Sequence, residues 1–136
     1  MGKKISVGDK FDYDFSFTNE DVILFSKATG DFNPIHLDSE YAKNTIFKKP
    51  IVHGFLGGSV FSKVFGTLFP GNGTIYLKQD LSFFKPMYRL EKYKATFEIM
   101  TTNVNKNRAL VKTLIIDNKN EIIINGEALI QHPLIF

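Results

Sequence analysis

The chain has 136 residues, the usual length of one globular domain, and we expect a single domain over residues 1–136. Its composition is 43% hydrophobic and 23% charged, which excludes intrinsic disorder and fibrous repeats. The net charge of +3 is dispersed and cysteine is absent, so we expect no nucleic-acid partner, no disulfide and no bound metal ion.

The N-terminal segment carries two lysines, but no apolar run follows them. A signal peptide needs an apolar core after its charges, and a membrane-spanning helix needs about 20 mostly apolar residues. We therefore expect a cytoplasmic protein without a membrane contact.

Residues 11–17 alternate between apolar and polar side chains, which is the period of a half-buried strand. Thr18 can cap a helix, because acidic residues follow it in the first turn and Gly30 ends the helical spacing. The sequence therefore predicts a strand over residues 11–17 and a helix over residues 19–29.

Residues 31–36 contain the dipeptide Asn33-Pro34, and proline disfavours the helical region for the residue before it. We expect a loop there, between two helices. Asp38 can cap the second of these helices, which is predicted over about residues 39–44.

Residues 53–69 are nearly all apolar or small, and Lys63 is their only charge, so a buried helix is predicted. Three glycines, Gly57, Gly58 and Gly66, each lower helix propensity by about 1 kcal/mol against alanine. This indicates close packing or the approach of a ligand. The sequence Pro-Gly-Asn-Gly at residues 70–73 predicts a tight turn after the helix.

The second half of the chain predicts a sheet, because apolar segments are separated by short polar turns. The strands are expected over residues 74–84, 92–103, 109–117 and 121–131. One strand, two short helices, a long apolar helix and four or five strands predict an α+β domain. In it, a curved antiparallel sheet wraps around the long central helix.

Asp31 and His36 stand five residues apart across the Asn-Pro turn, and both side chains can reach one point. A carboxylate beside an imidazole is a general acid–base pair that can hold and deprotonate a water molecule. The spacing alone favours a different interpretation, in which Asp31 caps a helix and His36 is a surface loop residue.

The segment Thr-Gly-Asp-Phe-Asn-Pro-Ile-His at residues 29–36, with Ala42 after it, resembles the hydratase-2 motif of MaoC-like (R)-specific enoyl-CoA hydratases. The resemblance continues through Ser62 and through residues 50–54, 70–76 and 82–86. Ala28 departs from the motif, which prefers a larger aliphatic residue or glycine there. The resemblance implies a hot-dog fold and the reversible hydration of trans-2-enoyl-CoA to (R)-3-hydroxyacyl-CoA.

The resemblance also implies catalytic residues. The catalytic aspartate and histidine of the family correspond to Asp31 and His36, and the glycine that opens its central helix corresponds to Gly54. Asp31 would accept a proton from water, while His36 would orient this water and return a proton to Cα; which of the two delivers that proton is open. The Gly54 N–H would stabilise negative charge on the thioester oxygen.

Other residues near the motif are candidates for substrate binding. Asn33 either holds the loop or is only a turn residue, and Ser62 matches a serine near the family's site or is a small packing residue. Candidate walls for the acyl chain are Phe32, Ile35, Phe55, Leu56 and Phe83, although such residues more often belong to a core. The acyl chain length and the pathway are not readable from these residues.

The remaining histidines and lysines receive no catalytic role. His53 is interpreted as a helix-start residue whose ring has its hydrogen bonds, and His132 lies close to the end of the chain. Lys48, Lys49 and Lys85 can reach coenzyme A phosphates, but isolated lysines usually only solubilise a surface.

No metal or redox cofactor is expected, because side chains activate the water and coenzyme A arrives as part of the acyl-CoA substrate. A homodimer is expected, since the family joins two sheets at their exposed edges. Two alternatives remain: a hot-dog acyl-CoA thioesterase and a non-catalytic acyl-CoA-binding hot-dog protein. The central helix lacks the acidic residue that such thioesterases use, and the presence of both Asp31 and His36 argues against a mere binder.

Overall fold

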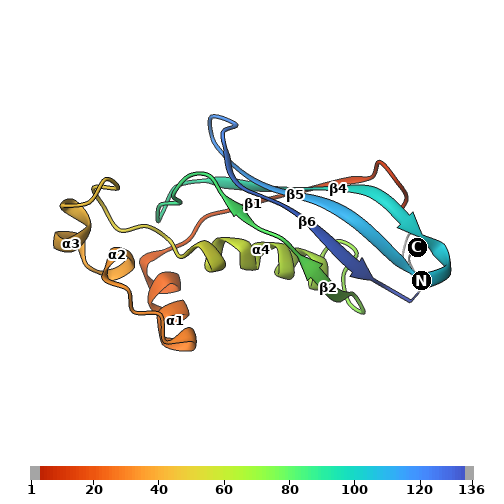
Figure 1. The fold of residues 1–136 in the computed structure, drawn as a ribbon, viewed down its shortest axis with the longest axis horizontal. Helices are drawn as coiled ribbons and strands as arrows, with labels where there is room; N and C mark the ends of the chain where they lie inside the picture. The colour runs from red at the N-terminus through yellow and green to blue at the C-terminus, as the bar shows by residue number, and fades with distance from the viewer. Residues whose placement is uncertain (1–3, 134–136) are drawn as a thin grey trace.

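The computed structural model describes residues 4–133, in which an antiparallel sheet curves around a long helix (Figure 1). The strand order is β1 (Lys10–Phe15), β4 (Tyr93–Asn103), β5 (Arg108–Asp117), β6 (Ile122–Gln131) and β2 (Ile75–Gln79); the short β3 (Ser82–Phe83) also pairs with β6. Every pairing is antiparallel. The predicted α+β class is confirmed.

The helices occupy two places relative to the sheet (Figure 1). Helix α4 (Gly54–Thr67) runs along one face of the sheet. Helices α1 (Asn19–Thr29), α2 (Pro34–Leu37) and α3 (Ser39–Lys43) gather at one end of the molecule, beyond the N-terminal end of α4. The 3₁₀ helix η1 (Val104–Lys106) joins β4 to β5.

The core lies between α4 and the sheet. Buried and half-buried residues alternate through most of β4, so one face of this strand meets the helix. Phe97 of β4 packs edge to face against Phe61 and Phe65 of α4, with ring centroids 5.7 and 5.3 Å away. Aromatic pairs prefer this geometry, so these contacts hold α4 at one position on the sheet.

The boundaries of α1 follow from its two ends. The Thr18 side chain accepts a hydrogen bond from the Asp21 N–H, and the Asp21 carboxylate accepts one from the Thr18 N–H, which completes a capping box. At the other end, Gly30 adopts a left-handed conformation with φ of 79°. The predicted helix over residues 19–29 is confirmed.

Two predicted segments are corrected. Residues 34–37 form a helical turn, α2, instead of a loop, because proline fits the first position of a helix and the Asn33 side chain accepts from the Ile35 N–H. The strand predicted over residues 74–84 is divided into β2 and β3, with a register shift between Tyr76 and Lys78. That shift lies inside β2, and the division itself falls at residues 80–81, which belong to neither strand.

Helix α4 is buried on one side only in the single chain. Phe55, Ser62 and Lys63 are exposed, so the prediction of a helix buried all round is wrong. A side chain at Gly57 would place its Cβ 2.9 Å from Ile124, which explains that glycine by close packing. Nothing lies within 4 Å of such a Cβ at Gly66, so close packing does not explain the glycine at that position.

Membrane insertion was not expected from the sequence. Within residues 4–133, no helix combines the length and the apolar character that crossing a bilayer requires. The cytoplasmic location stays a prediction from the sequence.

Candidate active site

Asp31 follows the left-handed end of α1 and begins a tightly bonded loop. Its N–H donates to Thr29 Oγ1 at 3.2 Å, and its Oδ1 accepts from the Asn33 N–H at 3.2 Å. The side chain is exposed to solvent. The local hydrogen bond engages Oδ1 and leaves the rest of the carboxylate's accepting capacity for another molecule.

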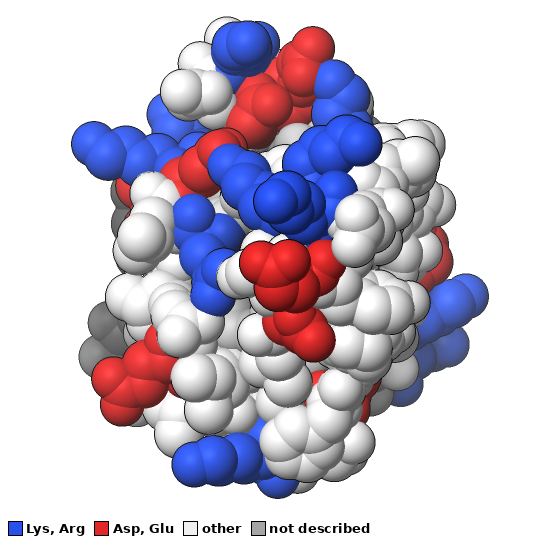
Figure 2. All heavy atoms as spheres, turned by 90° about the vertical axis from the view of Figure 1, so that its left-hand side faces the viewer, with Lys and Arg blue, Asp and Glu red and all other residues white. Residues whose placement is uncertain are grey.

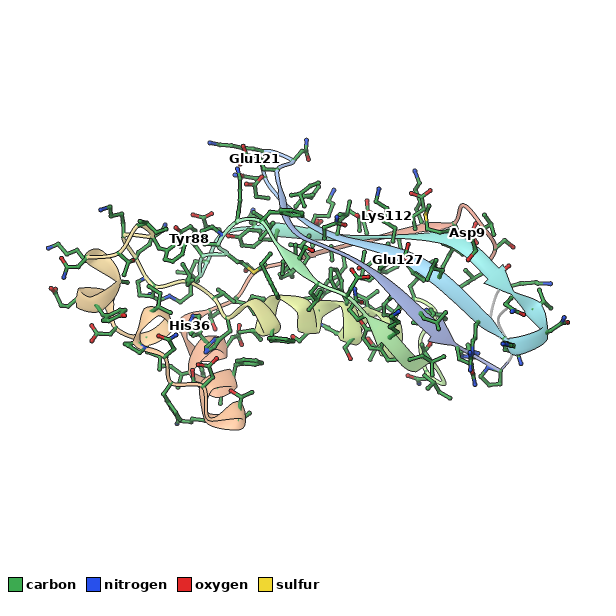
Figure 3. All side chains as sticks on the ribbon, in the orientation of Figure 1. Asp9, His36, Tyr88, Lys112, Glu121 and Glu127 are labelled. Carbon is green, nitrogen blue, oxygen red and sulfur yellow. The ribbon has the colours of Figure 1, made fainter. Side chains whose placement is uncertain are left out.

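His36 is held by the segment that precedes α4. Its Nδ1 lies 2.7 Å from the carbonyl oxygen of Ile51, and the Ile51 N–H donates to the Ile35 carbonyl at 3.1 Å. The ring is 8% exposed and lies where α2 approaches the start of α4 (Figure 3). The interpretation of His36 as a surface loop residue is therefore wrong.

The contact with Ile51 also decides which nitrogen of His36 carries hydrogen. A carbonyl oxygen only accepts, so Nδ1 must be the donor. In the neutral ring, Nε2 then carries the lone pair and accepts hydrogen bonds. His36 is thereby prepared to act as a base through Nε2.

A second histidine, which the sequence gave no role, completes the cluster. The His53 ring stacks on His36 with centroids 3.8 Å apart, and its Nε2 lies 3.2 Å from the Asp31 carbonyl oxygen. Nδ1 of His53 is buried and has no hydrogen-bond partner among the residues described. The expectation that all hydrogen bonds of this ring are satisfied is therefore wrong.

The surroundings of His53 favour its neutral form. Burial of the ring lowers its pKa from the ordinary value of 6.5, and the neighbouring His36 lowers it further. The hydrogen bond to the Asp31 carbonyl and the charge of that residue act in the opposite direction but are outweighed. The cluster therefore combines the exposed Asp31 side chain with a buried His53 whose pKa is lowered.

Gly54 opens α4 directly after His53. The first N–H groups of a helix have no acceptor within the helix and carry its positive dipole end. An added Cβ at Gly54 would lie 2.7 Å from the Phe83 ring, so only glycine lets this ring approach the start of the helix. Gly54 thus presents a backbone donor next to the His36 and His53 pair.

An apolar cavity of about 320 Å³ begins at this point. It runs between the start of α4, the segment after β3, and β6. Its lining is mostly hydrophobic, and the residues are Phe47, Ile51, Val52, His53, Gly54, Gly57, Phe83, Phe84, Lys85, Pro86, Met87, Ile123 and Ile124. Such a space suits a hydrocarbon chain better than a charged group.

Asp31, His36 and His53 also form a group that can be tested as a metal site. One nitrogen or oxygen atom from each lies within 4.8 Å of the others. However, the two rings are stacked, with an angle of 26° between their planes, so their nitrogens point side by side instead of converging. Nδ1 of His36 and Nε2 of His53 both face carbonyl oxygens. The arrangement fits hydrogen bonding better than metal coordination.

The predicted substrate-binding residues are only partly brought together. Asn33 caps α2, which supports its role in holding the loop, and Ile35 is half-buried beside His36. Phe32 and Phe55 are 57% and 71% exposed and do not line the cavity. Ser62 is exposed and lies eight residues, or about 12 Å of helix rise, after Gly54.

The other polar candidates have partners elsewhere. His132 Nε2 donates to the Asn72 carbonyl at 2.8 Å, beyond the C-terminal end of α4, because a carbonyl only accepts. Lys49 pairs with Glu91 and Lys85 with Glu121. None of the three lies in the Asp31, His36 and His53 cluster.

One family profile matches most of the chain. A family profile described as "MaoC like domain" matches residues 3–120. The (R)-specific enoyl-CoA hydratase of Aeromonas caviae is 36% identical over 131 residues, which cover 96% of this chain and 98% of the relative. The mitochondrial 3-hydroxyacyl-[acyl-carrier-protein] dehydratase of Arabidopsis thaliana is 32% identical over 91% of this chain and 75% of its own length.

The fold is also similar to a solved structure, that of R-hydratase PhaJ1 from Pseudomonas aeruginosa in the unliganded form. The two superpose with a TM-score of 0.89 at 38% sequence identity, over 95% of this chain and 83% of the other. Both kinds of comparison therefore agree with the hot-dog fold expected from the residues around Asp31 and His36.

Proposed function

Because the chain belongs to the MaoC-like domain family, we propose that it adds water reversibly to trans-2-enoyl-CoA and yields (R)-3-hydroxyacyl-CoA. Its similarity to (R)-specific enoyl-CoA hydratases makes it an enzyme of the hydratase type. The observation that carries the detailed proposal is the cluster of Asp31, His36 and His53, whose polar atoms lie within 4.8 Å of one another immediately before the helix-opening Gly54. In this proposal Asp31 and His36 activate the water.

The spacing of Asp31 and His36 suits one water molecule between them. No direct hydrogen bond joins the two side chains within the described part of the chain, yet one polar atom of each lies within 4.8 Å of the other. Two acceptors that each bind one hydrogen of a water at about 2.8 Å are roughly 4.4 Å apart. Nε2 of His36 and the free carboxylate oxygen are both acceptors, so the water donates to each and keeps a lone pair for attack.

The proposed reaction follows from this arrangement. The water oxygen bonds to Cβ, the Cα–Cβ double bond shifts toward the thioester, and negative charge develops on the thioester oxygen. Asp31 accepts a proton from the water, and the pair returns a proton to Cα, which restores the carbonyl. The Gly54 N–H, at the positive end of α4, stabilises the charged oxygen in the transition state.

A pair of substitutions at Gly54 tests the backbone donor. Gly54→Pro removes the N–H, and proline is tolerated at the first position of a helix. The preceding residue, His53, already has φ of −56° and ψ of 135°, the extended conformation that proline requires of its predecessor. Gly54→Ala keeps the N–H and adds a comparable contact with Phe83. We expect Gly54→Pro to lower kcat by about 10²- to 10³-fold relative to Gly54→Ala.

Circular dichroism and thermal unfolding serve as the control for folding of both variants. Equal turnover of the proline and alanine variants, with both folded, would exclude the Gly54 N–H as the oxyanion donor.

We assign the acyl chain to the cavity of about 320 Å³ beside Gly54. Its apolar lining and its opening next to the proposed oxyanion donor support this assignment. Phe32 and Phe55, proposed from the sequence as walls, remain candidates only for the entrance because both are largely exposed.

The carrier of the acyl group is proposed to be coenzyme A. Lys and Arg side chains gather at the end of the molecule that contains α1 to α3, with acidic side chains between them (Figure 2). Lys49 and Lys85 are already paired with glutamates, so we assign no phosphate contact to them. A carrier-protein thioester, the substrate in the name of the Arabidopsis relative, presents the same reacting atoms to Asp31 and His36.

We propose a homodimer for this chain. β2 is an edge strand of the sheet, and its Ile75 and Leu77 side chains are 49% and 41% exposed. Phe55, on the open side of α4, is also exposed. An edge strand with exposed apolar side chains, together with the exposed Phe55, favours association with a second copy. Light scattering of the active preparation should give the mass of two chains, and a fully active monomer would contradict the proposal.

Incubation of the purified protein with crotonyl-CoA tests the proposed function. Hydration removes the absorbance of the enoyl thioester, and chiral analysis should then show mainly (R)-3-hydroxybutyryl-CoA. A thioesterase would instead release free thiol, and a non-catalytic binder would do neither. A mainly (S) product would overturn the assignment.

We expect turnover to be unchanged after extensive chelation, because the stacked histidines suit hydrogen bonding.

A further inference from the structure

The His53 ring contacts His36 and the backbone of Asp31, and His53 directly precedes Gly54. It stacks on His36, its Nε2 lies 3.2 Å from the Asp31 carbonyl oxygen, and its own backbone caps α4 immediately before Gly54. We propose that His53 is a positioning residue, which joins the Asp31 loop and the His36 ring to the start of α4. This inference rests on the proposed function and adds a residue to it.

The hydrogen bond to Asp31 determines the form of the His53 ring. Nε2 faces a carbonyl oxygen, which only accepts, so Nε2 must carry hydrogen. Ser26 Oγ lies 3.2 Å from the same nitrogen and can share this donor. In the neutral ring, Nδ1 is then without hydrogen, in agreement with its buried position and its lack of a partner within residues 4–133.

The ring has little freedom to leave this position. It is 2% exposed and packs between two other rings, with centroids 3.8 Å from His36 and 4.8 Å from Phe25. Ser26 and Phe25 belong to α1, and His36 belongs to α2. His53 therefore links α1, α2 and the Asp31 loop to the N-terminus of α4.

This link fixes the distance between the Asp31 carboxylate and the Gly54 N–H, on which the proposed reaction depends. The Asp31 carboxylate and the Gly54 N–H lie on separate segments, and the Nε2 contact ties the Asp31 backbone to the residue next to Gly54. Water and thioester oxygen must be held at a defined separation, since a misplacement of about 1 Å can cost roughly 100-fold in rate. Loss of the contact should therefore lower kcat more than it raises KM.

Two amide substitutions separate this role from simple packing. In His53→Gln, the side-chain nitrogen can occupy the place of Nε2 and donate to the Asp31 carbonyl. In His53→Asn, the amide is one methylene shorter and reaches only the place of Nδ1. Both variants lose the aromatic stack, and both are expected to unfold at a lower temperature than the wild type.

We expect His53→Asn to lose roughly 10- to 100-fold in kcat for crotonyl-CoA, with KM little changed, and His53→Gln to recover most of this loss. A residue that only fills space gives no such recovery, because both amides lack the ring. Equal kcat values for the two variants, whether both are high or both low, would overturn the inference.

A spectroscopic measurement on the unaltered protein tests the contact independently of activity. Nitrogen chemical shifts of the histidine rings near pH 7 should show hydrogen on Nε2 of His53 and on Nδ1 of His36. Hydrogen on Nδ1 of His53 would refute the contact with Asp31. An inactive wild-type protein with the expected shifts would refute the proposed function, and the positioning role of His53 with it, while the contact itself would stand.

Discussion

Asp31→Asn should leave a folded protein whose kcat for crotonyl-CoA is about 10²- to 10⁴-fold lower, the usual loss when a general base is removed. Asparagine keeps an oxygen that can accept from the Asn33 N–H, so the loop hydrogen bond at 3.2 Å can survive. The second carboxylate oxygen becomes an amide nitrogen, which donates and cannot take a proton from water. The loss should appear in kcat, because the binding of the acyl chain does not use this group.

The chain contains a matched control for this substitution. Asp38 is also an exposed loop aspartate, and its Oδ1 accepts from the Tyr41 N–H at 3.1 Å to cap α3. Asparagine caps nearly as well as aspartate, so Asp38→Asn should keep both stability and turnover. If Asp31→Asn behaves like Asp38→Asn in both measurements, Asp31 is a loop residue and the proposed mechanism is wrong.

Most helix and strand positions were predictable because local features set them. The capping box at Thr18 and the left-handed Gly30 determine both ends of α1, and these depend only on neighbouring residues. Strand β4, where buried and half-buried residues alternate, was equally clear. The division between β2 and β3 was not predictable, because it depends on how residues 80–81, which belong to neither strand, lie against β6.

The candidate site was predictable only in part. Asp31 and His36 are near each other in sequence, and the Asn-Pro turn between them made their approach foreseeable. Two further contacts were hidden: the Ile51 carbonyl that orients His36, and His53, which lies 22 residues after Asp31. The signals for His53 were its place before the helix-opening Gly54 and its inclusion in the resembling segment 50–54, and a plain capping residue fits both.

His36→Asn should lower kcat by about 10²- to 10⁴-fold, as for Asp31→Asn, because it removes the nitrogen that faces the water. The asparagine amide can take the place of Nδ1 and keep the hydrogen bond to the Ile51 carbonyl, so α2 should stay in position. His132→Gln is the matched control, since it changes another buried histidine but keeps a donor for the Asn72 carbonyl. That control should turn over crotonyl-CoA at the wild-type rate.

The double variant with Asp31→Asn and His36→Asn then tests whether the two residues share one water molecule. If both hold the same water, the first substitution already removes its activation, and the second has little left to remove. We therefore expect the double variant to be scarcely slower than the slower single variant. Losses that multiply would show that each residue acts on a different step, and the bridging position between the carboxylate and Nε2 of His36 would then be wrong.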